Sequence, residues 1–173
     1  MSKSDAFLQA GKTAVLQNIH GTMQFLQRFP PFNQMEHAHL AYLVEQCQLR
    51  FYAPGESIIK PADGPVEHFY IVKQGRVVGE RPDSAETTFE ITTGECFPLA
   101  ALLGERATRT EHKAAEDTFC LQLNKPAFIK LFALSSPFRD FALRQSKAHA
   151  ATFHSQPLTA DEEAAFERMA RQS

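Results

Sequence analysis

The sequence of 173 residues contains no tryptophan and only three cysteines, Cys47, Cys96 and Cys120. An odd number of widely spaced cysteines argues against a disulfide framework, and the absence of a Cys-x-x-Cys pair excludes the usual zinc and redox motifs. Each cysteine stands among apolar neighbours, so we expect three small buried hydrophobes. Fifteen phenylalanines against three tyrosines supply the aromatic bulk of the core instead.

The chain also lacks a charge surplus and a long apolar run. Lys and Arg number 18 against 20 Asp and Glu, which argues against a nucleic-acid-binding surface. The longest apolar stretches, such as residues 96–103, are far shorter than the roughly 20 residues that span a bilayer. Residues 1–5 have neither the basic start nor the apolar continuation of a signal peptide. We therefore expect a cytoplasmic chain whose partners are neither nucleic acid nor membrane.

Turn signals divide the middle of the chain into short β-type runs. Clusters of Pro, Gly, Asp and Ser separate them at intervals of roughly 8–12 residues, a spacing typical of antiparallel sandwiches and barrels. The expected strands are residues 49–53, 57–59, 66–72, 76–81, 87–92, 110–115 and 118–123.

Helical periodicity flanks this region on both sides. Apolar residues recur near helical spacing as far as Pro30, and Asn33 with Glu36 predicts the cap of a second helix. Helical patterns return from Lys125, and a short charged helix is expected within residues 158–172. The predicted fold is mainly β, an antiparallel jelly-roll-like β-roll with helices at both ends. We divide it into a helical segment (1–30), a central domain (31–153) and a linker with a helix (154–173).

Catalytic motifs are incomplete. Residues 11–13, Gly-Lys-Thr, have the end of a phosphate-binding P-loop, but Ala6 stands where the first glycine is required. No Gly-x-Ser-x-Gly motif occurs, and no cysteine has the surroundings of a nucleophile. We expect no enzymatic activity from this chain.

The histidines do not form a metal-binding pattern. His37 and His39 are two residues apart on a predicted helix, so their side chains diverge. A cupin-type site needs several histidines on adjacent strands, whereas only His68 and His112 could contribute here. We expect no metal centre.

Several motifs in the central region stand in a characteristic order. They are Pro31-Phe32 before a helix, Tyr-Ala-Pro-Gly-Glu-Ser-Ile-Ile (52–59), His-Phe-Tyr-Ile-Val-Lys-Gln-Gly-Arg-Val (68–77), Gly-Glu-Cys-Phe-Pro-Leu-Ala-Ala-Leu-Leu (94–103) and Ala-Glu-Asp-Thr (115–118). Together they resemble the cyclic nucleotide-binding domain family over about residues 30–150. The resemblance implies an eight-stranded β-roll, a non-catalytic regulatory role, and cyclic AMP (cAMP), cyclic GMP (cGMP) or a related phosphate as ligand.

Residues 94–110 resemble the family's phosphate-binding cassette, in which a short helix presents backbone N–H groups to the cyclic phosphate. Leu99 replaces a glutamate that binds the ribose 2′-hydroxyl in the family. Pro98 replaces a glycine, which removes one N–H group. The ligand-binding residues that the resemblance implies are Gly94, Leu99, Ala100, Ala101, Arg109 and Thr110.

The arginine that neutralises the phosphate in the family has more than one counterpart here. Counting forward from the cassette gives Thr108 or Arg109, and Arg109 followed by Thr110 imitates the family's Arg-Ser or Arg-Thr pair. Counting backward from residues 116–117 gives Thr108, and Arg106 is a further candidate. The sequence leaves these alternatives open.

Two functions fit these observations. The first is a sensor of a nucleotide or another phosphate ligand that relays occupancy through its C-terminal helices. The second is a degenerate roll that binds no nucleotide and serves dimerisation or docking, which Leu99 favours. The Phe-Pro-Leu cassette also resembles the N-terminal domain of bacterial proteins that continue into a pair of CBS domains and a putative nucleotidyltransferase domain. Those domains, and a second copy in a homodimer, are the expected partners.

Overall fold

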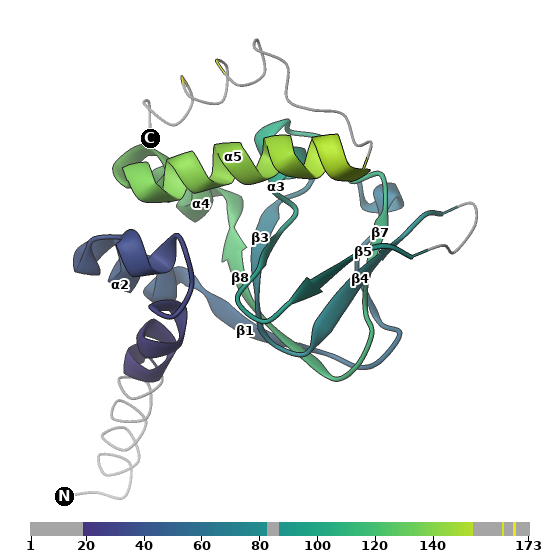
Figure 1. The fold of residues 1–173 in the computed structure, drawn as a ribbon, viewed down its shortest axis with the longest axis horizontal. Coiled ribbons are helices and arrows are strands. Elements are labelled where there is room, and N and C mark those ends of the chain that lie inside the picture. The colour runs from purple at the N-terminus through teal and green to yellow at the C-terminus, as the bar shows by residue number, and fades with distance from the viewer. Residues whose placement is uncertain (1–18, 83–86, 154–163, 165–167, 169–173) are drawn as a thin grey trace, which may run out of the picture.

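The computed structural model describes residues 19–82 and 87–153, together with residues 164 and 168. A β-roll of two four-stranded sheets forms the centre of the molecule, and helices lie along one side of it (Figure 1). The order of helix, roll and helix is the predicted one. The charged helix predicted within residues 158–172 falls almost entirely outside the described residues. The domain boundaries at 30 and 154 stay predictions.

One sheet, called sheet A here, has antiparallel pairing throughout. Its spatial order is β1 (Gln48–Tyr52), β8 (Thr118–Asn124), β3 (His68–Gln74) and β6 (Cys96–Phe97). β6 was not predicted as a separate strand, because two residues are too few to show an alternating pattern.

The second sheet, sheet B, is antiparallel as well. Its order is β2 (Ser57–Ile59), β7 (Glu111–Ala114), β4 (Arg76–Glu80) and β5 (Thr87–Thr92). The predicted bounds of β2 and β5 are confirmed, and the other predicted strands agree to within two residues at each end. The predicted antiparallel β-roll is therefore confirmed.

Helices precede, interrupt and follow the roll. They are a helical stretch at residues 19–26, the 3₁₀ turns η1 (Phe32–Gln34) and η2 (Pro61–Asp63), and the α-helices α2 (His37–Gln46), α3 (Leu99–Leu103), α4 (Lys125–Leu134) and α5 (Ser136–Phe153). α4 begins where the Asn124 side chain accepts a hydrogen bond of 2.9 Å from the backbone N–H of Ala127, which satisfies one of the free donors of the first turn.

The predicted start of α2 at Asn33 is wrong. Asn33 lies inside η1, where the N–H of Gln34 donates to the carbonyl of Pro31. α2 begins after Glu36, and no side chain caps it. The tight turn buries the Phe32 side chain, and burial of a phenylalanine is worth more than an N-cap hydrogen bond, roughly 1.5–3 against about 1 kcal/mol.

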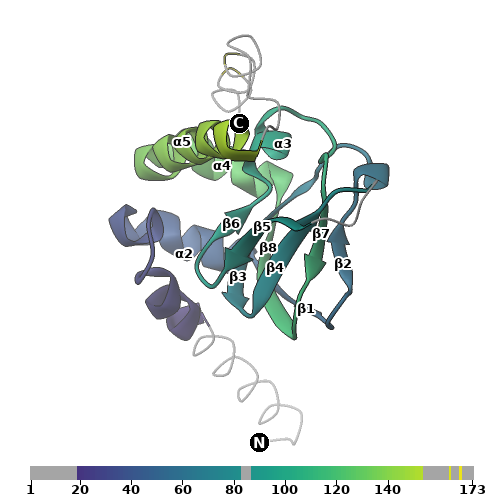
Figure 2. The ribbon, with the colours of Figure 1, turned by 45° about the vertical axis from the view of Figure 1, so that its right-hand side comes forward.

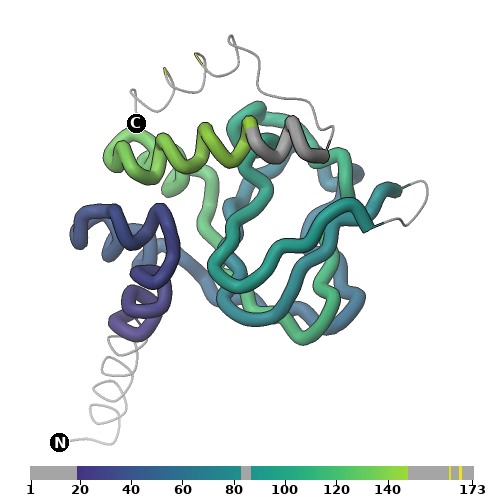
Figure 3. The backbone as a smooth tube through the Cα atoms, viewed as in Figure 1, coloured from purple at the N-terminus to yellow at the C-terminus, as the bar shows by residue number. Residues whose placement is uncertain are grey.

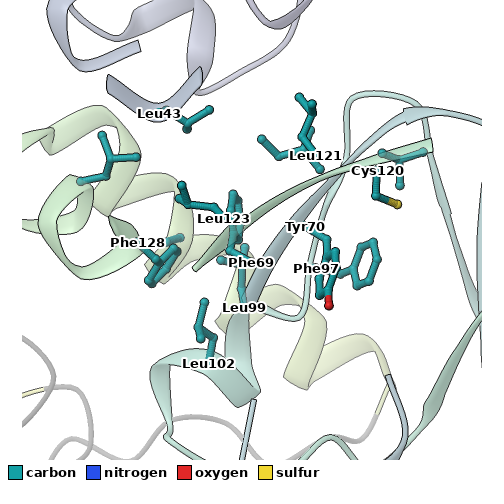
Figure 4. Close-up of a cluster of buried hydrophobic side chains, with 14 of the residues drawn as sticks. Leu43, Phe69, Tyr70, Phe97, Leu99, Leu102, Cys120, Leu121, Leu123 and Phe128 are labelled. Atoms are coloured by element: carbon teal, nitrogen blue, oxygen red, sulfur yellow. The ribbon is translucent and has the colours of Figure 1, made fainter. Parts of the chain in front are cut away.

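The helices cover the outer face of sheet A with aromatic side chains. Figure 2 shows α2, α4 and α5 on the same side of this sheet. The ring of Phe69 on β3 lies 5.2 Å from that of Phe128 on α4 and 5.7 Å from that of Phe138 on α5. Figure 4 shows Phe69 pointing toward Phe128, whereas the next residue, Tyr70, lies beside Phe97. The alternation of β3 therefore supplies two cores, one under the helices and one between the sheets.

Removal of the Phe128 ring is expected to destabilise the fold strongly. Phe128 is fully buried, so Phe128→Ala should lower the free energy of unfolding by roughly 3–5 kcal/mol, the usual cost of a phenylalanine cavity. Leu134→Ala is the matched control on the same helix, because the Leu134 side chain is 50% exposed. Urea denaturation of both variants measures the difference, and equal losses would contradict this assignment of the core.

Candidate functional site

The cassette starts at a sharp turn that the N-terminal helical segment contacts. Gly94 has a φ of +88°, a conformation that L-residues rarely adopt. A Cβ atom at Gly94 would overlap the ring of Phe29. The glycine is therefore required both by the backbone and by the close approach of Phe29.

The loop after α3 is held at its start, by contacts of Glu105 and Arg106. The N–H of Arg106 donates to the carbonyl of Ala101 at 3.0 Å, and the Arg106 carbonyl accepts from the N–H of Val66 at 3.1 Å. The ammonium group of Lys125, at the start of α4, lies 3.0 Å from the carboxylate of Glu105. These contacts tie the loop to the roll and to the C-terminal helices.

The cassette helix turns most of its side chains inward. Leu99 and Ala101 are each 7% exposed, and Ala100 is half-buried. α3 packs against α5, and Figure 3 shows α5 passing over the end of the roll that carries the cassette. A shift of α3 would therefore displace the residues of α5 that pack against it.

The candidate arginine positions differ sharply in burial. Arg109 is exposed, whereas Arg106 and Thr110 are half-buried. Thr108 is 7% exposed, and its hydroxyl oxygen has no hydrogen-bond partner among the described residues. The side chain that this loop buries is thus a threonine, and the neighbouring guanidinium points to solvent.

Aromatic rings from both sheets stack in the space between them. The Tyr70 ring on β3 lies 5.0 Å from that of Phe97 on β6, with an interplanar angle of 10°. Phe97 in turn stacks 5.3 Å from His112 on β7, again at 10°. The Phe89 ring on β5 lies 5.4 Å from His112 and is tilted by 59°. These four rings, called the aromatic stack here, join the two sheets.

A glycine makes room for the stack. Gly79 on β4 stands opposite both Phe89 and His112 in the strand register. A Cβ atom at Gly79 would overlap the Phe89 ring. The missing side chain therefore lets the ring cross over β4 and reach His112.

Sequence reasoning missed this stack. It weighed His112 as a metal ligand, although a group of three or more His, Cys, Asp or Glu side chains suited to a metal occurs nowhere among the described residues. The signal that could have shown it is the alternation of side chains along a strand. Phe89 on β5, and His112 and Ala114 on β7, occupy the alternate positions that are buried.

A polar group adjoins the stack on sheet A. The Gln122 side chain donates a hydrogen bond of 3.1 Å to the Tyr70 hydroxyl. Burial is the main cause that raises the pKa of Tyr70, and it also raises the pKa of Tyr52. Both phenols are therefore neutral hydrogen-bonding groups at physiological pH.

The three cysteines are free thiols. Burial raises the pKa of Cys47 and that of Cys120 to about 12, and it raises the pKa of Cys96 further. Thiols with such pKa values remain protonated near neutral pH and are poor nucleophiles.

Within the described part of the chain, no helix is both long and apolar enough to cross a membrane.

Residues 49–135 match the family described as the cyclic nucleotide-binding domain. The chain is also 40% identical over 83 residues to a glutamate–cysteine ligase of Pseudomonas fluorescens, a match that covers 44% of this chain and 16% of that protein. The chain thus spans about a fifth or less of the length of the curated relatives that it matches.

Solved structures share the fold at low identity. The regulatory domain of Toxoplasma gondii protein kinase A, crystallised with cAMP, superimposes with a TM-score of 0.70 at 16% identity, covering 79% of this chain and 52% of that one. The regulatory subunit of a cAMP-independent protein kinase A from Trypanosoma brucei gives 0.67 at 19% identity, with coverages of 90% and 53%. A triple mutant of the trypanosome protein, with glutamate, threonine and valine replaced by alanine, arginine and alanine, was solved with cAMP in its A site.

The packing of the aromatic stack predicts that residue 79 must be a glycine. Gly79→Ala should destabilise the protein by roughly 1–3 kcal/mol, because the added methyl group must displace the buried Phe89 ring. Gly21→Ala is the matched control. Its Cβ would meet nothing within 4 Å on a helical stretch, so this change should stabilise by about 0.5–1 kcal/mol. Thermal denaturation of both variants measures the two signs, and a neutral Gly79→Ala would contradict the close packing of Phe89.

Proposed function

We propose, because the chain belongs to the cyclic nucleotide-binding domain family, that it is a non-catalytic regulatory domain that binds cAMP weakly or not at all. The observation that carries this proposal is the burial pattern of the cassette. The two buried side chains at the positions discussed for the family's charged groups are Leu99 and Thr108, and neither carries charge.

A buried phosphate without a positive partner carries a large desolvation cost. Arginine normally meets this cost with two parallel hydrogen bonds and a permanent charge. The Thr108 hydroxyl can donate one neutral hydrogen bond to a phosphate oxygen, and the Leu99 side chain can donate none. A cyclic phosphate therefore gains little from the side chains of this cassette.

A threonine is also among the substituted residues of a cAMP-independent neighbour. The trypanosome protein solved with cAMP in its A site carries three substitutions, one of which replaces a threonine by arginine. We take Thr108 as the counterpart of this threonine, which is the alignment counted backward from residues 116–117 and the position where the family carries its arginine.

Transmission is the second part of the proposal. Phe29 contacts the turn at Gly94, and α3 packs against α5, so the cassette contacts both the N-terminal helical segment and the C-terminal helix. We propose that α5 passes a change in the position of α3 to a neighbouring domain. The Phe97-Pro98-Leu99 cassette supports a CBS pair and a nucleotidyltransferase-like domain as those neighbours, and a homodimer of the chain as the assembly.

A second candidate function is a sensor for a different phosphate ligand, held by Arg109 and by the backbone around residues 99–101, with Gly94 and Thr110 beside it. The observation in its favour is the exposed side chain of Arg109, directly after the buried Thr108. The first N–H groups of any helix lack partners within that helix, so backbone donors at Leu99, Ala100 and Ala101 would complete such a site.

Calorimetry with cAMP and cGMP tests the main proposal. The loss of one charge-assisted hydrogen bond costs roughly 1.5–3 kcal/mol, or about 10- to 150-fold in affinity. Two such losses should leave the wild-type protein without submicromolar binding. Leu99→Glu alone should not tighten the binding of cAMP a hundredfold, because Thr108 stays uncharged and Pro98 still withholds an N–H group.

The triple variant Leu99→Glu/Thr108→Arg/Arg109→Ala restores both charged groups. It should bind cAMP at least about tenfold more tightly than Leu99→Glu, since an arginine–phosphate pair is worth roughly 1.5–3 kcal/mol. Submicromolar binding by the wild-type protein would overturn the proposal. An unchanged affinity of the triple variant would remove Thr108 from the phosphate position.

Arg109→Ala discriminates between the two candidate functions. In the sensor, loss of the guanidinium should abolish binding of any phosphate ligand found by screening cyclic mononucleotides and dinucleotides, while the midpoint of thermal unfolding without ligand hardly changes. In the main proposal, no ligand is found and Arg109→Ala costs within about 0.5 kcal/mol, as most surface changes do. A phosphate ligand that binds wild type and Arg109→Ala equally well would remove Arg109 from the site, and Arg106 would be tested next.

A further inference from the structure

One part of the outer face of sheet A has no helix over it. On β1, the Leu49 side chain is 54% exposed and that of Phe51 is 51% exposed. They point to the same face, because they are two residues apart on a strand. Phe51 pairs with Phe119 on β8, and their ring centroids are 5.1 Å apart. We call Leu49, Phe51 and Phe119 the β1 patch.

The β1 patch continues a surface that is otherwise covered. Leu49 stands opposite Leu121 in the strand register, and Leu121 is only 4% exposed. β1 is also an edge strand of sheet A. Natural proteins usually cover or charge an edge that carries large apolar side chains, because it is prone to pair with other chains.

Among the described residues, just three large hydrophobic side chains are exposed, and two of them belong to this strand. The outward-facing residues of β1 are therefore more apolar than the rest of the described surface. Their side chains fit an apolar partner that lies along the strand beyond the reach of α2.

We propose that residues 1–18 of this chain bind the β1 patch. The described chain begins at Ile19, which already packs against the core, and Met23 one turn later is buried. In Figures 1 and 2 the described chain begins next to α2, on the side of the molecule where α2 leads into β1. The described residues thus begin on the side of the molecule that carries β1.

Length and composition suit residues 1–18 to this role. Eighteen residues reach about 27 Å as a helix and about 60 Å when extended. Four strands span only about 15 Å at the usual separation. The segment carries apolar side chains near helical spacing at Phe7, Leu8, Val15 and Leu16, which would bury the exposed faces of Leu49 and Phe51. The proposal is independent of any ligand in the roll.

The absence of tryptophan provides a direct test. Phe51→Trp places the only indole of the protein in the β1 patch, and its fluorescence reports coverage of the patch. In the otherwise unchanged chain we expect emission at short wavelength and weak quenching by iodide. Added Ser substitutions at Phe7, Leu8, Val15 and Leu16 should shift the emission to longer wavelength and increase the quenching constant.

A matched variant with Gln9→Ser and Gln17→Ser controls for substitution within the same segment, and it should leave the emission unchanged. Circular dichroism checks that each variant stays folded, and a chain shortened to begin at residue 19 gives a second measurement. If the indole is exposed in every variant, residues 1–18 do not cover the patch. If its coverage depends on protein concentration and not on the Ser substitutions, the occupant is a second copy of the chain, and the proposal is wrong.

Discussion

The stacking of Phe97 on His112 is the contact on which the architecture of the roll depends. The two sheets share no hydrogen-bonded strand pair among the described residues. Side chains therefore join them: the packed rings, and the Thr118 hydroxyl on β8, which bonds to the backbone of Arg76 on β4. Phe97 comes from a strand of two residues, yet it stacks on Tyr70 of its own sheet and on His112 of the other. Because Phe97 lies two residues before α3, the same ring also fixes where the cassette helix begins.

That placement connects the cassette to helices from both ends of the chain. The Phe29 ring occupies the space that a side chain at residue 94 would need, and α5 packs against α3. Protein interiors are close-packed and transmit strain, and conformational changes usually move whole elements as units. A short helix that packs against α5 is such an element, whether its trigger is a ligand, a neighbouring domain or a second copy.

The sequence predicted the fold well because the relevant signals are local. The turn residues predicted the bounds of β2 and β5 correctly, and the helical pattern that returns at Lys125 predicted the start of α4. It failed where a long-range contact outweighed a local preference. Asn33 has the side chain of an N-cap, but the burial of Phe32 determines the local turn. The role of His112 depended on Phe97 and Phe89, which are distant in sequence and come from two other strands.

The position of the cassette arginine could not be predicted for a related reason. Counting residues forward and backward through a loop of uncertain length gives neighbouring answers, and neighbouring residues near a strand point to opposite faces. Burial separates the alternatives, because Thr108 is 7% exposed whereas Arg109 is exposed. An arginine excluded from the interior keeps its hydration, and a threonine taken into it loses a water partner at modest cost compared with a charge. The fold has therefore buried the less costly of two adjacent side chains, and this choice leaves the buried member of the pair uncharged.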